Sequence, residues 1–234
     1  MTLYYSDELV RLYLGDAREV LPDIPSKRAV LVTDPPYGID LDTGQSKSVT
    51  KTTHRKVHGD DVDFDPAWLL ERFDRAVIFG GNNFASRLPD SGDWIVWDKV
   101  TRNGLKMRIA EYELAWSRGV TGRTVGLRHM WSGAFRASER GTSFHPCQKP
   151  VALIEWILSL PGIRGADTVV DPYAGSGATL LAARNAGLYG VGAEIDERYC
   201  EVIAERLSSQ TVAIDFGPAE PVDVPMDFGL ENLK

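Results

Sequence analysis

The sequence predicts an α/β fold in which helices cover both faces of a mainly parallel β-sheet. Short apolar strands alternate with amphipathic helical stretches along most of the chain, which is the pattern of such folds. Within 169–194, a strand, a glycine-rich turn, a helix and a strand ending in an acid follow one another, as in the nucleoside-binding half of a doubly wound sheet. The chain has 234 residues, of which 43% are hydrophobic, so one large domain with a sizeable core is expected.

Strands are expected where a short apolar run ends at turn-forming residues. In the first half these runs are 11–14, 29–33, 76–79, 94–97 and 112–116. A helix begins at Asp65-Pro66, with Asp65 as its N-cap and Pro66 in its first turn. Residues 38–63 are rich in Gly, Ser, Thr, Lys and Asp and lack apolar periodicity, so a long loop is expected there.

The second half begins with a stretch, 117–144, that its five glycines should keep irregular. Pro150 then opens a helix that Pro161-Gly162 ends. A strand at 168–170, a helix at 178–186, a strand at 189–193 and a last helix capped by Asp196 complete the domain, which we place at 1–210. The Pro-rich, acidic segment 211–234 is expected to be a surface tail.

The charge of the chain is unevenly distributed. The net charge is -7, which argues against a simple cationic nucleic-acid binder. Two segments are nevertheless basic: 47–58, and 99–140, where nine basic residues face three acids. The nine are Lys99, Arg102, Lys106, Arg108, Arg118, Arg123, Arg128, Arg136 and Arg140. Either segment alone would fit a solvated surface, but together they favour a face that binds a polyanion.

Several classes of protein are disfavoured by the sequence. No apolar run has the length of a membrane helix, and the first residues lack the features of a signal peptide, so a cytoplasmic protein is expected. The two cysteines, Cys147 and Cys200, cannot make a disulfide framework or a four-ligand zinc site. His145 and Cys147 would supply only two ligands, and we predict no metal site.

The glycine-rich turn at 171–177 has the features of a nucleoside site. Gly175 and Gly177 allow the backbone to approach a ligand at a helix N-terminus. Glu194 follows Gly175 by 19 residues and ends the next strand, where a carboxylate can accept hydrogen bonds from both ribose hydroxyls. Leu180 stands where a dinucleotide site would prefer a third glycine, which favours a nucleoside without pyrophosphate. The alternative is a turn that only closes a strand-helix corner.

The turn Asp34-Pro35-Pro36-Tyr37 leaves a buried strand abruptly. Two prolines remove two N–H donors and fix the backbone, so the turn is rigid and its carbonyls are open to a ligand. A carboxylate, a carbonyl and an aromatic ring together suit a planar group that carries an NH₂. The alternative is a strand end with Tyr37 as a lid on the core.

Three motifs, in order along the chain, resemble those of the β-class amino-methyltransferases of DNA. They are Asp34-Pro35-Pro36-Tyr37, the segment 145–150 (HPCQKP), and the segment 171–177 (DPYAGSG). The resemblance covers about 12–207, and the glycine-rich turn begins 137 residues after Asp34, which marks this class. It implies a permuted Rossmann-like methyltransferase sheet, in which the strands at 168–170, 189–193, 12–14 and 30–33 are the first, second, third and fourth. Cys147 departs from the family, where Thr is frequent.

The resemblance also implies a site for S-adenosylmethionine. Asp171, Tyr173 and the backbone of Ala174, Gly175, Ser176 and Gly177 would line its methionine end, and Glu194 would hold its ribose. Asp16 would reach its adenine amino group and Lys149 its carboxylate. Asp34 and the Pro35 carbonyl, positioned by Pro36, would accept hydrogen bonds from the amino group of the target base while Tyr37 stacks on its ring.

The activity that the resemblance implies is methylation of adenine N6 in double-stranded DNA after base flipping. Cytosine N4 is the alternative, although members specific for cytosine tend to carry Ser at the position of Asp34. A non-catalytic DNA-binding relative is a less favoured alternative. A small target-recognition insert is expected at about 117–144, with His129, Trp131 and Phe135 near the duplex, unless Trp131 belongs to the core. A homodimer and a cognate restriction endonuclease are candidate partners, in a bacterial or phage-infected cell.

Overall fold

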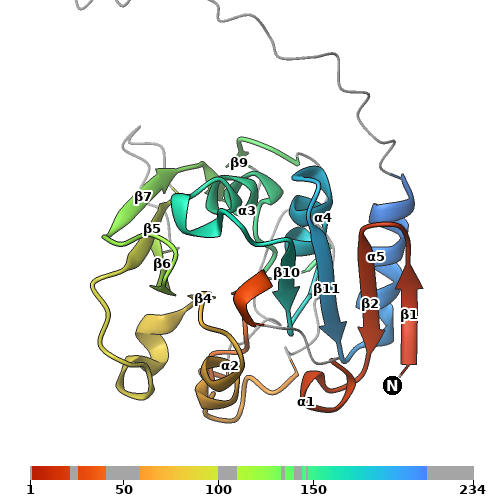
Figure 1. Cartoon of the computed structure of the whole chain (residues 1–234), viewed down its shortest axis with the longest axis horizontal. Helices are drawn as coiled ribbons and strands as arrows, with labels where there is room; N and C mark the ends of the chain where they lie inside the picture. The colour runs from red at the N-terminus through yellow and green to blue at the C-terminus, as the bar shows by residue number, and fades with distance from the viewer. Residues whose placement is uncertain are drawn as a thin grey trace, which may run out of the picture.

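The fold is a twisted sheet with helices on both of its faces (Figure 1). The computed structural model describes residues 2–21, 26–40, 58–99, 110–132, 135–139, 144–145 and 147–209. Within these residues, nine strands form the main sheet in the order β1-β2-β11-β10-β3-β4-β6-β5-β7, and β8 and β9 form a separate ribbon. The predicted α/β class is confirmed.

The strands and helices are short, and their bounds follow. The strands are β1 Thr2–Ser6, β2 Val10–Leu14, β3 Ala29–Thr33, β4 Ala76–Phe79, β5 Trp94–Asp98, β6 Tyr112–Arg118, β7 Val125–Arg128, β8 Trp131–Ser132, β9 Phe135–Arg136, β10 Thr168–Asp171 and β11 Tyr189–Glu194. The helices are α1 Ala17–Val20, α2 Ala67–Arg72, α3 Val151–Leu158, α4 Ala178–Asn185 and α5 Glu197–Ser209. Shorter 3-10 turns lie at Ser26–Arg28, Gly81–Arg87 and Pro161–Ile163.

Five parallel strands form the centre of the sheet. Strands β2, β11, β10, β3 and β4 pair in parallel, so the two central positions between β2 and β3 are filled by strands from the end of the domain. Four of them, β2, β11, β10 and β3, are the strands that the resemblance numbers third, second, first and fourth. Strand β6 is antiparallel to β4 and to β5, and β7 is parallel to β5. The carboxyl ends of β5 and β7 therefore lie on the same edge of the sheet as those of the central strands.

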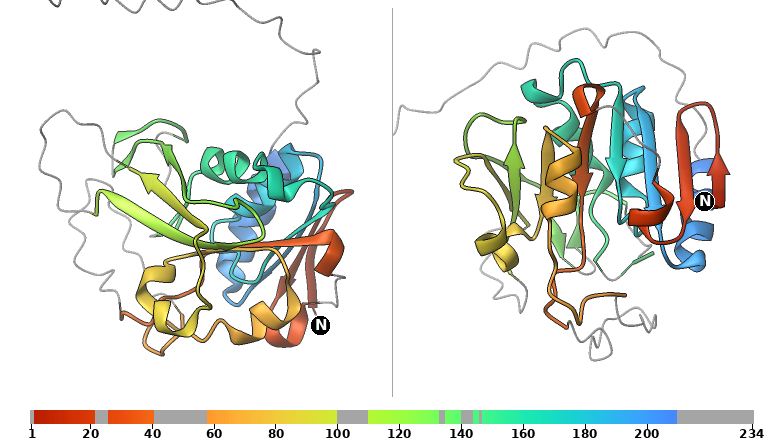
Figure 2. Two further views of the ribbon diagram at one scale, coloured as in Figure 1. Left: turned by 60° about the vertical axis from the view of Figure 1, so that its left-hand side comes forward. Right: turned by 60° about the horizontal axis from the view of Figure 1, so that its bottom comes forward.

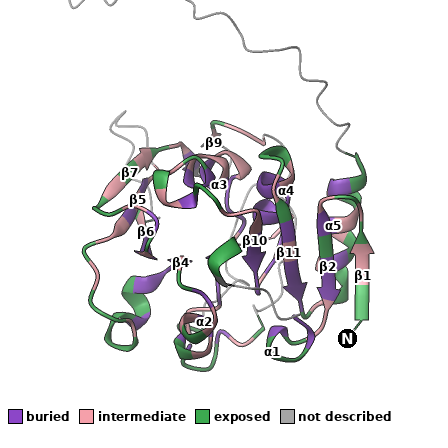
Figure 3. Ribbon diagram, in the orientation of Figure 1, coloured by how far each residue is buried: buried purple, intermediate pink, exposed green. Residues whose placement is uncertain are grey.

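The core has two main layers, one on each face of the sheet, beneath the helices that Figure 2 shows there. Alternate residues of β3 divide between them: Val30 and Val32 pack toward α3 and α4, while Ala29 and Leu31 pack toward α1 and α2. Helix α5 covers β2 through Cys200, Ile203 and Leu207. Strands β3, β4 and β10 are consequently buried on both sides, as Figure 3 shows for β10, whereas Arg11 of β2 is exposed.

The structure corrects the expectation that 117–144 is irregular. Residues 125–128 form β7, which joins the edge of the main sheet, and Trp131–Ser132 pairs with Phe135–Arg136. Val125 and Leu127 pack on the core while Gly126 and Arg128 are exposed, so this strand has a two-residue period. The strand was not predicted because it has only four residues, one of which is a glycine. The edge strand β1 was also not predicted.

Some predicted features lie outside the described residues. They are most of the loop at 38–63, which is described only at 38–40 and 58–63, the basic residues of 100–109, and the tail at 211–234. None of the helices among the described residues combines the length and the apolar character needed to cross a membrane.

Candidate active site

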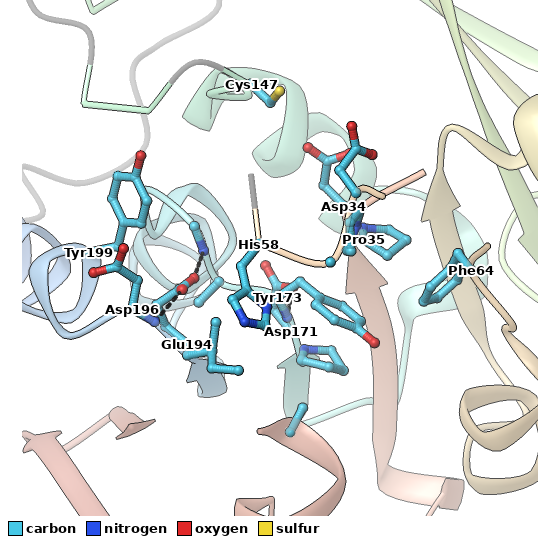
Figure 4. Close-up of a pocket in the computed structure, with 18 of the residues that line it drawn as sticks. Asp34, Pro35, His58, Phe64, Cys147, Asp171, Tyr173, Glu194, Asp196 and Tyr199 are labelled. Carbon is cyan, nitrogen blue, oxygen red and sulfur yellow. Dashed lines mark hydrogen bonds between the residues drawn. The ribbon is translucent and has the colours of Figure 1, made fainter. Parts of the chain in front are cut away.

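A cavity of about 500 Å³ opens at the carboxyl edge of the parallel strands. Figure 4 shows Asp34 and Pro35 on one side of it and Glu194, Asp196 and Tyr199 on the other, with Asp171 between. All but one of the predicted site residues line it, from five segments of the chain: Asp16, Asp34, Pro35, Pro36, Tyr37, Lys149, Asp171, Tyr173, Ala174, Gly175, Ser176 and Glu194. Their common location arises because open α/β sheets place the turns after adjacent parallel strands together.

Gly177 is the predicted residue that does not line the cavity. It precedes α4 with φ of 80°, and a Cβ here would lie 2.9 Å from Cγ1 of Ile203 on α5. Its glycine is therefore required by the turn and by the packing of α5. Leu180, at the position of the absent third glycine, is fully buried beside α5.

Glu194 holds the glycine-rich turn from beneath. One of its carboxylate oxygens, Oε2, accepts the backbone N–H of Gly175 at 2.8 Å, and Oε1 accepts that of Asp196 at 2.9 Å. Burial raises the pKa of Glu194 to about 7, against the opposing effect of these hydrogen bonds. Each oxygen has a second lone pair, so the carboxylate can still accept from a ligand. Asp16 follows β2, the strand paired with β11; it accepts the Arg18 N–H at 2.9 Å and caps α1.

Asp171, at the end of β10, is buried at the floor of the cavity. Its Oδ1 accepts the Thr33 hydroxyl at 2.7 Å and the Tyr173 N–H at 3.1 Å. Burial raises the pKa of this carboxyl to about 6. Thr33, the last residue of β3, thus joins the two strand ends that carry the glycine-rich turn and the Asp-Pro-Pro-Tyr turn.

The Asp-Pro-Pro-Tyr turn is held by an acid that sequence reasoning did not identify. Asp60 is buried, and its Oδ1 accepts the backbone N–H groups of Tyr37 at 2.9 Å and of Gly38 at 3.1 Å. The Tyr37 hydroxyl in turn donates to Asp34 Oδ1 at 2.5 Å. Asp60 belongs to the segment 38–63, which was predicted to be a loop. In such a segment the sequence does not distinguish an acid that accepts buried hydrogen bonds from one that faces solvent.

Lys149 lies against Asp34. Its ammonium nitrogen is 2.5 Å from Asp34 Oδ2 and 2.8 Å from Oε1 of Glu113. Burial opposes the charged form of Lys149, but Asp34 and Glu113 outweigh it and raise the pKa of this amine. The predicted pairing of Lys149 with a cofactor carboxylate is therefore not supported by this geometry, since two protein carboxylates already hold the ammonium group.

Glu113 was counted in the sequence only as one acid in a basic segment. Because β6 runs antiparallel to β4 and β5, its first residues lie at the edge where those strands end. Glu113 pairs there with Lys149 and, through Oε2, with Lys99 at 3.2 Å. Burial favours the neutral acid, but the two lysines outweigh it and lower the pKa of Glu113.

Lys149 is positioned by the segment before α3. Glu139 accepts the N–H of Val151, the first residue of α3, at 2.8 Å and the side-chain amide of Gln148 at 3.2 Å. Arg206 of α5 donates to Glu139 at 2.7 Å and also to the carbonyl of Ser176. The motif that carries Lys149 is thus tied to the glycine-rich turn through one arginine.

The predicted DNA-binding residues have different environments. Arg118 donates to the carbonyls of Leu70 and Phe73, so its charge supports the fold. Arg128 is exposed at the carboxyl edge and pairs with Asp98 at 2.8 Å. Trp131 is buried in the core, which confirms the alternative reading for that residue. The positions 102, 106, 108 and 140 and the side chain of Phe135 lie outside the described residues.

The described donors and acceptors fit a nucleoside-like ligand. The cavity is within the usual size range of small-molecule sites. Carboxylates of Asp16 and Glu194 line one part of it and backbone of the glycine-rich turn another. Among the residues that the structure describes, no group of three or more His, Cys, Asp or Glu side chains is arranged to hold a metal ion.

Comparison with known proteins gives a consistent set of relatives. A family model described as DNA methylase, of the N6/N4 methyltransferases, matches residues 81–206. The type II methyltransferase M2.LlaDCHI of Lactococcus lactis subsp. cremoris is 30% identical, with 88% of this chain and 91% of the relative aligned. The type II methyltransferase M.HpaI of Haemophilus parainfluenzae is 37% identical, with 88% of this chain and 76% of the relative aligned.

Solved structures share the fold. The M1.HpyAVI-SAM complex superposes with a TM-score of 0.52 at 22% identity, covering 85% of this chain and all of the other. PvuII DNA methyltransferase, described as cytosine-N4-specific, gives a TM-score of 0.57 at 17% identity and covers 88% of each chain.

Proposed function

Because this chain belongs to the DNA methylase family of adenine-N6 and cytosine-N4 methyltransferases, we propose that it methylates the N6 amino group of adenine in double-stranded DNA, with S-adenosylmethionine as the donor. The observation that carries the proposal is that the glycine-rich turn and the Asp-Pro-Pro-Tyr turn line the same cavity. The glycine-rich turn suits a nucleoside, and the Asp-Pro-Pro-Tyr turn suits an amino group. A reaction between a nucleoside cofactor and an amino group requires both ligands in the same cavity.

The cofactor would be held by residues of one half of the cavity. Glu194 would accept hydrogen bonds from its ribose hydroxyls, and Asp16 from its adenine amino group. Asp171, Tyr173 and the backbone of 174–176 would line its methionine end. When bound, S-adenosylmethionine supplies an electrophilic methyl group on a sulfonium sulfur.

Asp34 would activate the target amine. The lone pair of an exocyclic amino nitrogen is delocalised into the ring, so the nitrogen is a poor nucleophile. Hydrogen bonds from its N–H groups to the Asp34 carboxylate and the Pro35 carbonyl favour a pyramidal nitrogen with an available lone pair. As the nitrogen gains positive charge, the preformed Asp34 carboxylate stabilises that charge without reorganising. The proton leaves the nitrogen after the methyl group has been transferred.

The target base would have to leave the duplex. The Asp34 carboxylate lies in a cavity behind the carboxyl edge of the sheet, where a stacked base cannot reach it. Exposed arginines such as Arg128 would contact the phosphate backbone. We assign adenine rather than cytosine as the target because Asp34 stands at the first position of the turn, where the cytosine-specific members of the family tend to carry Ser.

Nucleoside mass spectrometry of DNA treated with the protein tests the proposal. We expect N6-methyladenine. N4-methylcytosine alone would contradict the base assignment, and the absence of both methylated nucleosides would contradict the proposed activity. Asp34→Asn should lower the single-turnover rate about 10²–10³-fold, a loss typical of removing a preorganised partner of a developing charge. The exposed Asp90, which does not line the cavity, provides the matched control Asp90→Asn.

A further inference from the structure

We propose that Glu113 is a positioning residue for methyl transfer, whose carboxylate shares the ammonium group of Lys149 with Asp34 and so leaves Asp34 free to accept the target amine. The inference rests on the proposed role of Asp34. Nothing in the mechanism above uses Glu113, although its side chain is only 19% exposed and contacts Lys149, which lines the cavity.

Lys149 creates the need for such a residue. Its ammonium nitrogen lies 2.5 Å from Asp34 Oδ2, and the Tyr37 hydroxyl occupies the other oxygen of Asp34. With Lys149 as its only charged neighbour, Asp34 would be half of a neutral ion pair. A neutral pair stabilises a developing positive charge much less than an anion does, and a buried site offers little solvent to make up the difference.

Glu113 supplies a second anion for the same ammonium group. Its Oε1 is 2.8 Å from the Lys149 nitrogen, so Lys149 bridges two carboxylates. Lys149 and the two carboxylates carry one net negative charge, which Lys99, on the other oxygen of Glu113, balances. The Tyr37 hydroxyl also lies 3.3 Å from Glu113 Oε1, which places Glu113 against both donors to Asp34. Lys99 contacts the other oxygen of Glu113, Oε2, at 3.2 Å.

An ammonium group shared between two carboxylates is also easier to displace from either one. Lys149 has three N–H donors and can keep its bond to Glu113 when a target amino group takes its place on Asp34 Oδ2. Without the Glu113 charge, the same displacement would leave a buried ammonium group without a charged partner, which is costly. Glu113 therefore lowers the cost of admitting the neutral amine to the Asp34 carboxylate.

The test is Glu113→Gln, which keeps the size of the side chain and removes its charge. We expect the single-turnover rate of methyl transfer at saturating DNA and S-adenosylmethionine to fall about 10- to 100-fold, as for partners that orient metal ligands. The dissociation constant for S-adenosylhomocysteine, measured by calorimetry, should stay within about twofold, since Glu113 does not line the cavity wall where Glu194 and Asp16 lie. Glu111→Gln, an exposed acid two residues away, is the matched control and should keep the wild-type rate.

The pH profile separates this role from a merely structural one. Burial raises the pKa of Asp34, Lys149 opposes this effect, and the Glu113 charge adds to it. The titratable groups around Asp34 are Tyr37, Glu113, Cys147, Lys149 and Asp171, and Lys99 faces Glu113 from the other side. Removing the Glu113 charge should lower the pKa of Asp34, so the acid limb of the single-turnover rate should move to lower pH although the rate itself falls.

The outcomes distinguish the inference from the proposed function. A wild-type rate in Glu113→Gln, or a rate lost together with cofactor binding, would overturn the role of Glu113. If Glu113→Gln does not fold, Glu113→Asp keeps the charge farther from Lys149 and should lose rate about 2- to 10-fold with an unmoved acid limb; an unchanged rate would overturn the inference. A wild-type rate in Asp34→Asn would instead overturn the proposed function on which the inference rests.

Discussion

A methyl group added to Gly80 would lie 2.1 Å from Cε1 of the Tyr37 ring. Gly80 follows β4 and has φ of 68°, so both its backbone and its lack of a side chain serve the neighbouring turn. The ring of Tyr37 is thus seated on bare backbone, with its hydroxyl directed at Asp34. Two strand ends, those of β3 and β4, together fix the position of one aromatic side chain.

Gly80→Ala should therefore displace Tyr37 and lower the methyl-transfer rate by about 10-fold or more, because small misplacements of reacting groups are costly. Gly165→Ala is the control: Gly165 also has a positive φ, of 79°, but an added methyl group would meet nothing within 4 Å. Both variants should lose about 1–2 kcal/mol of stability from the left-handed backbone. Thermal melts and single-turnover rates measure the two effects. Equal rates in the two variants would show that the packing of the Tyr37 ring against Gly80 does not affect methyl transfer.

Asp60→Ala should loosen the Asp-Pro-Pro-Tyr turn. It removes the acceptor of two backbone N–H groups, those of Tyr37 and Gly38, and should cost about 1–3 kcal/mol in the free energy of unfolding. We expect the rate of methyl transfer to fall while cofactor affinity is kept. The exposed neighbour provides the control Asp61→Ala, which should change stability by no more than about 0.5 kcal/mol. Similar denaturation midpoints for the two variants would contradict the role of Asp60.

Cofactor affinity should rise with pH up to about 7 and then level off. Burial raises the pKa of Glu194 to about 7, and ribose hydroxyls that donate to Glu194 would favour its ionised form, so its pKa should fall on binding and a proton should be released. In the free protein the same raised pKa means that stability falls as the pH increases through about 7.

Calorimetry with S-adenosylhomocysteine in buffers of different ionisation enthalpy measures this proton release. The affinity should change by up to about tenfold per pH unit below 7, the limit for one proton. Glu194→Gln should flatten the dependence and leave only what Asp171, whose pKa is about 6, contributes. A pH dependence that survives unchanged in Glu194→Gln would remove Glu194 from the ribose site.

Arg128→Ala should weaken DNA binding and reduce the salt dependence of the association constant by about 0.9 in slope for one lost phosphate contact. Arg128 is at the carboxyl edge of the sheet, and 60% of its side chain is exposed in its pair with Asp98. Arg28, in an exposed pair with Asp167, lies at the opposite edge, where β3 begins. Arg28→Ala should therefore leave the binding isotherm unchanged. Equal changes in DNA affinity in the two variants would show that DNA does not bind at the carboxyl edge of the sheet near Arg128.

The parts of the site that could be predicted from sequence are those that end a buried strand. Asp34 follows β3 and begins the Asp-Pro-Pro-Tyr turn, and Glu194 is the last residue of β11. The parallel order of β2, β11, β10 and β3 then brings these ends together. Local patterns were sufficient because each residue's position follows from the strand that immediately precedes it.

Glu113 could not be found in this way. It stands near the start of a strand, and its place beside Lys149 depends on the antiparallel pairing of β6 with β4 and β5. The partner of Lys149 was similarly hidden, because Asp34 is 115 residues away in the chain. Neither pairing leaves a trace in residue spacing, since both arise from the register of strands that meet only in the folded sheet.

The sheet order has a consequence for the way the chain must fold. Strands β2 and β3 are consecutive in the sequence, yet β11 and β10 lie between them. During synthesis, the first 160 residues would therefore leave the ribosome with the middle of their sheet missing, and β2 and β3 would have no parallel neighbour on the facing edges. Pairing across such a long separation is slow, and unpaired edges invite aggregation meanwhile. A nascent chain of this protein should accordingly depend on chaperones until β10 and β11 emerge and close the gap.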